Sequence, residues 1–245
     1  MTTIWNIFDP DTEVLESARN LPHWDQTGAL TFVTMRLADS MPKRIVANWH
    51  EEIELWLAEH GLSGRKIEDV FGDLSVDSKL KEDLKRFKRR RWHGHLDDCH
   101  GDCPLRRPRL AEEVAKSLLH FNGVRYDLER FVVMPNHAHV LIQMHAGYQL
   151  RKELGGIMRF SDRVINGFTG RSGEFWQSEP FDHLVRSLNQ FRYLQQYIYD
   201  NPAKAKLRTG ELCFGNTVTT RRVELRKTTL RVVNYIPISS RPQLQ

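Results

Sequence analysis

One stretch, residues 131–143 (FVVMPNHAHVLIQ), constrains the fold of this chain more than any other. Two apolar runs flank Pro135-Asn136. Proline cannot donate to a sheet ladder and asparagine suits turns, so the pattern predicts two buried strands hinged there. His137 and His139 stand at i and i+2 of the second strand and therefore project from the same face. Two adjacent imidazoles can share one divalent cation, although two packed strand histidines without a metal fit the same pattern.

The composition bounds the class of protein. A chain of 245 residues with 40% hydrophobic content is expected to form one domain with an elaboration. Three cysteines, an odd number, argue against a disulfide framework and for the reducing cytoplasm. No apolar run approaches the ~18 residues of a membrane span, and the acidic N-terminus lacks the features of a secretory signal.

Periodicity predicts a mixture of strands and helices. Residues 1–28 are expected to form a loosely ordered N-terminal arm. Strands are expected at residues 29–37 and 124–134, and a short extended segment with a turn at 175–186. Helices are expected at residues 42–60, 77–92, 108–121, 149–166 and 187–200.

Residues 62–107 are interpreted as an insertion, and they carry much of the clustered basic charge of a chain whose net charge is +5. A basic run with interleaved aromatics is typical of phosphate contact, although it also fits a solvated helix face. The candidate DNA-binding residues are Lys85, Arg86, Lys88, Arg89, Arg90, Arg91, Arg106 and Arg107, with Arg221 and Arg222 near the C-terminus.

Histidines and cysteines follow the basic run within residues 93–103. They could be drawn as a zinc site, but they lack the paired C-x2-C spacing of common structural zinc sites. A glycine-bearing loop is the favoured interpretation here. The residues concerned are His93, His95, Cys99, His100 and Cys103.

The helix expected at 187–200 carries two tyrosines on one stripe. Tyr193 and Tyr197 stand at i and i+4, and Asn201 would continue the stripe. Pro202 disfavours helical backbone for the residue before it, so Asn201 is expected at or just past the helix end. Packing of an amphipathic helix would by itself account for tyrosines in these positions.

Several strings in the chain resemble one family. MPNHAHVLI (134–142) looks like the His-hydrophobe-His motif of the IS200-like single-tyrosine transposases, and YIYDNPAKA (197–205) looks like the signature of the REP-associated tyrosine transposases. The strings GEFWQ (173–177), FDHLVR (181–186), LPHW (21–24) and RLADSMP (36–42) are similar to segments of that family, in the same order. The resemblance covers about residues 21–207. It departs at Tyr193, which makes a Tyr-x-x-x-Tyr pair, and at 208–245.

The resemblance implies an α+β fold: a ferredoxin-like antiparallel sheet with helices on one face, forming an HUH-type nuclease core. That catalytic domain would span 29–207, with the helical insertion at 62–107. The C-terminal extension at 208–245 lies beyond the resemblance, and its alternating apolar and basic residues fit an edge strand or a DNA-binding tail. Tyr197 would be the nucleophile, and His137, His139 and Asn201 would hold the metal. Imidazole nitrogens with an amide oxygen suit Mg²⁺ or Mn²⁺.

The activity implied is site-specific nicking and joining of single-stranded DNA at REP-type palindromic hairpins, through a covalent 5′-phosphotyrosine, as in transposition and DNA recombination. The protein would act in the bacterial cytoplasm with the nucleoid, as a monomer or homodimer, without a membrane partner. Two alternatives stay open. One is a non-catalytic regulator that binds hairpin DNA, and the other is a two-tyrosine relaxase or replication initiator that also uses Tyr193.

Overall fold

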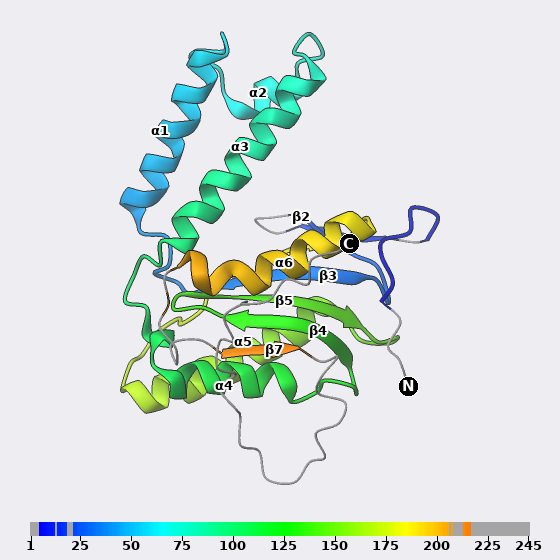
Figure 1. Ribbon diagram of the computed structural model, residues 1–245, viewed down its shortest axis with the longest axis vertical. Coiled ribbons are helices and arrows are strands. Elements are labelled where there is room, and N and C mark those ends of the chain that lie inside the picture. Colours follow the sequence, from blue (N-terminus) through cyan, green and yellow to red (C-terminus); the bar gives the residue numbers. More distant parts are fainter. Residues whose placement is uncertain (1–4, 13, 19–21, 206, 208–212, 217–245) are drawn as a thin grey trace, which may run out of the picture. The chain divides into compact units, whose positions relative to one another are not determined.

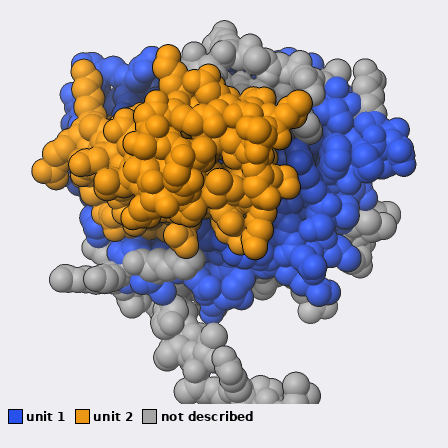
Figure 2. Space-filling view, turned by 90° about the horizontal axis from the view of Figure 1, so that it is seen from above, with its two compact units in different colours: residues 1–38, 104–245 blue, residues 39–103 orange. Residues whose placement is uncertain are grey.

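The computed structural model describes residues 5–12, 14–18, 22–205, 207 and 213–216. The chain forms two compact units (Figure 2), one made of residues 1–38 with 104–245 and the other of residues 39–103. In the described part of the chain, no helix is long and apolar enough to span a bilayer.

The larger unit is built on an antiparallel sheet with strand order β6-β3-β5-β4-β7. These strands are β3 (Leu30–Arg36), β4 (Tyr126–Val133), β5 (His137–Met144), β6 (Phe181–Leu184) and β7 (Cys213–Asn216). Without β7, the order β6-β3-β5-β4 is the ferredoxin-like arrangement, in which two β-α-β crossovers interleave. The expected α+β class with an antiparallel sheet is confirmed.

The tight turn between β4 and β5 forms where Pro135-Asn136 predicts it. The Met134 N–H donates to the His137 carbonyl oxygen at 2.8 Å and closes the turn. All of β5 is buried, because it is the central strand and both of its faces are covered. This burial explains why its sequence is an almost continuous apolar run in which the two histidines stand out.

Helices cover both faces of the sheet (Figure 1). The helices α4 (Pro108–Leu119) and α5 (Leu150–Thr169) pack on one face, against residues such as Met35, Val140 and Ile142. The helix α6 (Leu188–Lys204) packs on the opposite face, against residues such as Phe32 and Leu141. The helices α4 and α5 are the ones expected on one face of the sheet. The helix α6 covers the opposite face as well.

The end of α6 differs from the expectation that the helix stops near Asn201. The helix runs to Lys204 with Pro202 inside it, and the Ala205 N–H donates to the Asn201 carbonyl oxygen at 3.1 Å. Proline removes one backbone donor, but Ile198 is fully buried and packs with Ala205 and Leu207 in the same cluster. Tertiary packing of this last turn therefore outweighs the local preference of the residue before proline.

The smaller unit is a set of helices with its own core. It contains α1 (Lys43–Glu59), α2 (Ile67–Gly72) and α3 (Ser78–Asp97). Their core includes Ile53, Trp56, Leu57, Val70 and Leu84. The helix α1 thus shares a compact unit with most of the segment interpreted as an insertion.

The helix α3 is longer than expected. The sequence predicts it at 77–92, but it runs to Asp97, so the loop interpretation is wrong for residues 93–97. Leu96 is fully buried, and His95 Nε2 lies 3.1 Å from the Glu52 carboxylate of α1. These contacts hold the last turn in helical form despite Gly94.

The N-terminal arm contains ordered structure. Its strands β1 (Leu15–Ala18) and β2 (Pro22–Asp25) pair antiparallel, which differs from the expected loosely ordered arm. The Asn6 N–H donates to Gln143 Oε1 at 2.8 Å and ties the arm to β5.

The C-terminal extension is described only at β7. This edge strand pairs with β4, and Gly215 fits against the ring of Phe131 where a Cβ atom would collide with it. Arg221 and Arg222 lie outside the described residues.

Candidate active site

The strand β5 brings His137 and His139 together on the face of the sheet that α6 covers. Both side chains are fully buried, and their ring centroids lie 4.6 Å apart. Their neighbours on β3 in the register are Arg36 and Thr34, respectively. The i and i+2 spacing therefore produces the shared face that the sequence predicts.

Hydrogen bonds fix the orientation of both imidazoles. His137 Nδ1 lies 2.7 Å from Asn136 Oδ1, and His139 Nδ1 lies 2.9 Å from Thr34 Oγ1. An amide oxygen can only accept, so His137 donates from Nδ1 and keeps the lone pair of Nε2. Histidines that bind metals are commonly oriented in this way through their other ring nitrogen.

Tyr197 is the tyrosine that meets these histidines. Its hydroxyl lies 3.3 Å from His139 Nε2, and its side chain is buried. The Tyr193 ring stacks on that of Tyr197 at 6.3 Å, but Tyr193 is 65% exposed. Tyr199 is also exposed. Of the three tyrosines in α6, Tyr197 is therefore the one whose oxygen reaches the histidine pair.

Asn201 lies one helical turn beyond Tyr197 on the same stripe of α6. It is fully buried, and neither Oδ1 nor Nδ2 has a hydrogen-bond partner among the described residues. Burying a polar group without a hydrogen-bond partner lowers the stability of the fold by about 1–3 kcal/mol, so stability alone would not favour an asparagine at this position. An amide oxygen without a partner among the described residues, one helical turn from the tyrosine that meets His139, fits the donor set of a divalent cation.

A buried polar network holds α6 on the sheet. Glu129 lies in a β-bulge of β4, where the register shifts between Leu128 and Arg130. Its carboxylate accepts from Gln195 Nε2 at 2.7 Å and from Arg130 Nε at 2.7 Å, and the Arg130 guanidinium also donates to the Gln195 carbonyl. Gln195 precedes Tyr197 by two residues, so the network fixes the part of α6 that carries the hydroxyl.

The sequence interpretation missed Arg36. Phe32, Thr34 and Arg36 alternate along β3, and Thr34 and Phe32 both contact His139, so Arg36 lies on the same face beside His137. Burial lowers the pKa of Arg36 to about 10, which leaves the guanidinium charged at neutral pH. The i, i+2, i+4 pattern was the signal that could have identified it.

The basic run of α3 is largely engaged within its own unit. Lys85 pairs with Glu82, Arg86 with Asp83, and Arg91 with Glu52. The Lys88 ammonium lies over the rings of Trp49 and Phe71, and burial lowers its pKa. Arg89 and Arg90 are exposed, and neither guanidinium forms an ion pair with an acidic side chain of the described residues.

Arg106 and Arg107 belong to the larger unit. They are exposed at the end of a short 3-10 helix (Pro104–Arg106), directly before α4. The structure therefore divides the predicted DNA-binding residues between the two units.

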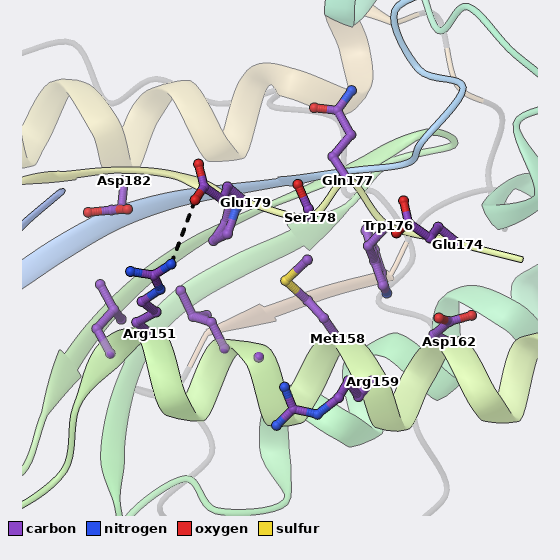
Figure 3. Close-up of a pocket in the computed structure, with 14 residues that line it drawn as sticks. Arg151, Met158, Arg159, Asp162, Glu174, Trp176, Gln177, Ser178, Glu179 and Asp182 are labelled. Carbon is purple, nitrogen blue, oxygen red and sulfur yellow. Dashed lines mark ion pairs between the residues drawn. The ribbon is translucent and has the colours of Figure 1, made fainter. Parts of the chain in front are cut away.

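A pocket of about 470 Å³ lies elsewhere on the larger unit (Figure 3). It is lined by α5 and by residues 174–182, and Arg151 pairs with Glu179 across it at 3.6 Å. Because α5 packs on the face opposite to α6, this pocket is separate from the histidine pair.

Comparisons with known proteins give a distant likeness to one solved structure. No protein-family model matches the chain, and no curated protein matches it. A solved structure of a REP-associated tyrosine transposase bound to a REP hairpin is similar over 76% of this chain and 74% of that chain, with 13% identity and a TM-score of 0.41. A likeness this weak assigns neither a family nor an activity to this chain.

Proposed function

We propose that this chain is a metal-dependent enzyme that nicks and rejoins single-stranded DNA at palindromic hairpins of the REP type, as a transposase or recombination enzyme would. The observation that carries the proposal is the buried Tyr197 hydroxyl, 3.3 Å from Nε2 of His139. The substrate class rests on the family resemblance of the motifs around His137 and Tyr197. The substrate also sets the expected place of action, the bacterial cytoplasm with its nucleoid.

In the proposed reaction, the Tyr197 oxygen attacks the phosphorus of a phosphodiester in line with the leaving 3′ oxygen. The phenol loses its proton, the P–O3′ bond breaks, and a 5′-phosphotyrosine and a free 3′-OH result. Held by His137, His139 and Asn201, a Mg²⁺ or Mn²⁺ ion would offset the negative charge of the phosphate and favour ionisation of the phenol. The phosphotyrosine ester retains the bond energy, so a 3′-OH can reverse the step without ATP.

Other residues of the chain prepare the site. Thr34 and Asn136 orient the imidazoles, and the Glu129–Gln195 hydrogen bond holds α6 in place. Arg36 would add a fixed positive charge beside the phosphate, where a preorganised charge stabilises the transition state most. Asn201 argues against the alternative of a pure binding protein. Its buried amide, which has no hydrogen-bond partner among the described residues, costs stability and contributes nothing to DNA binding at the surface.

Cleavage of labelled hairpin oligonucleotides is expected to require a divalent cation. The purified chain should nick them with Mg²⁺ or Mn²⁺ and leave a covalent adduct, and EDTA should abolish both products, because the phosphate charge would otherwise repel the phenolate. A linear duplex of the same sequence serves as the control and should stay intact. Cleavage that persists in EDTA would remove the metal from the proposal.

Salt dependence should separate Arg89 and Arg90 of α3 from the basic residues around them. Replacing both Arg89 and Arg90 with alanine should make the affinity less dependent on salt. The magnitude of the slope of log affinity against log salt should fall by about 1.4, or about 0.7 for each single-strand phosphate that is no longer neutralised. Arg91→Ala is the matched control, and a smaller change is expected because Glu52 already balances that charge. An unchanged slope in the double variant would mean that the run is a solvated face.

A further inference from the structure

A second cluster of metal-ligating side chains lies at the end of α3, inside the smaller unit. One donor atom from each of His95, Asp98 and His100 lies within 4.8 Å of the other two. His95 is in the last turn of α3, Asp98 is its C-cap, and His100 follows two residues later. The sequence pattern of histidines and cysteines in this segment did not single out this set, because it joins a carboxylate to two imidazoles.

We propose that His95, Asp98 and His100 bind a divalent transition-metal ion of the zinc class, independently of the catalytic role proposed for His137 and His139. Two imidazoles and one carboxylate form a donor set that zinc takes in proteins, with water in the fourth position. Tetrahedral ligands at zinc distances lie about 3.3 Å apart, so small side-chain rotations bring these donors into range.

A carboxylate behind His95 supports the site. His95 Nε2 lies 3.1 Å from Glu52 Oε2, and the tautomer that donates in this bond leaves the lone pair on Nδ1. A carboxylate that accepts from the other nitrogen of a histidine is the usual outer partner of a metal ligand. Arg91 Nε donates to the same carboxylate at 2.8 Å, so a guanidinium balances the charge that Glu52 places behind His95.

The loop after α3 is held in an unusual backbone conformation. Cys99 and Cys103 have φ values of 55° and 49°, in the left-handed region that residues other than glycine rarely adopt. The Asp102 N–H donates to the Asp39 carboxylate at 2.8 Å, and the Cys103 thiol donates to the Cys99 carbonyl oxygen at 2.8 Å. The thiol is thus engaged with backbone, and the loop presents His100 instead as the ligand.

The proposal is tested on the full chain with both catalytic histidines removed. After chelation and dialysis against Zn²⁺, the His137→Ala/His139→Ala variant should still bind one equivalent of metal, and Co²⁺ should give the visible bands of a tetrahedral site. Adding Asp98→Asn or His100→Ala should weaken this binding at least about 100-fold, and Glu52→Gln about 10- to 100-fold. His50→Ala, which changes a histidine of α1 outside the cluster, is the matched control and should bind as before.

The outcomes separate this site from the proposed catalytic site. If the proposed catalytic site binds no metal, the wild-type chain should still bind one equivalent of Zn²⁺, and Asp98→Asn should remove it. The inference stands in that case although the proposed function fails. If the variants at Asp98 and His100 keep normal Zn²⁺ affinity while circular dichroism reports an intact fold, the inference is overturned. The absence of any bound equivalent in a folded His137→Ala/His139→Ala variant overturns it equally.

Discussion

Replacing Tyr197 with phenylalanine is expected to abolish the covalent protein–DNA adduct on a denaturing gel. The substitution keeps the ring against Phe32 and Tyr193 and deletes only the oxygen that lies 3.3 Å from His139 Nε2. Strand cleavage should fall by at least about a thousandfold, which corresponds to about 4 kcal/mol of barrier. Hairpin binding, measured by gel shift, should stay within about twofold of the unmodified chain, a factor worth about 0.4 kcal/mol.

The neighbouring tyrosines supply the controls for this result. Tyr193→Phe and Tyr199→Phe should both retain the adduct, because these side chains are exposed whereas the two histidines are fully buried. If Tyr197→Phe still forms the adduct and Tyr193→Phe does not, the assignment of the nucleophile is wrong. If only the double variant at Tyr193 and Tyr197 loses it, the two-tyrosine alternative replaces the single-tyrosine mechanism.

Replacing Asn201 with leucine should stabilise the protein while it abolishes metal-dependent cleavage. The leucine side chain has the same branched arrangement of four heavy atoms, suits a helix better, and removes two buried polar atoms that lack partners among the described residues. Each unsatisfied group costs about 1–3 kcal/mol, so the free energy of unfolding should rise by at least about 1 kcal/mol. Urea unfolding and the oligonucleotide cleavage assay measure the two effects on the same preparation.

Gln143→Leu is the matched control for that experiment. Gln143 is also a buried amide, but its Oε1 accepts from the Asn6 N–H, so its loss should destabilise the protein by about 1–3 kcal/mol and leave cleavage largely intact. The opposite signs of the two stability changes are the diagnostic result. A loss of stability in Asn201→Leu would mean that this amide serves the fold, and the role proposed for it as a metal ligand would fail.

The sequence by itself determined the local geometry on which the site depends. A strand has a period of two, so the spacing of His137 and His139 places both on one face whatever surrounds them. A helix brings residues four apart onto one stripe, so Tyr193, Tyr197 and Asn201 align. Pro135-Asn136 marked the turn between β4 and β5 because a proline ends the ladder. Short-range periodicities of this kind need no knowledge of the rest of the chain.

Only the tertiary structure decided which of these residues meet. Packing against the sheet carried α6 through Pro202 and buried Asn201, although the residue before a proline disfavours helical backbone. Strand pairing brought Arg36 beside His137, and the packing of α6 brought Gln195 to the Glu129 bulge. In the smaller unit, the contact between α1 and α3 paired Arg91 with Glu52, although the sequence predicted Arg91 as a DNA-binding residue. These partners lie between about 40 and 100 residues apart in the chain, where no local pattern specifies the contact and the burial of apolar surface sets the geometry.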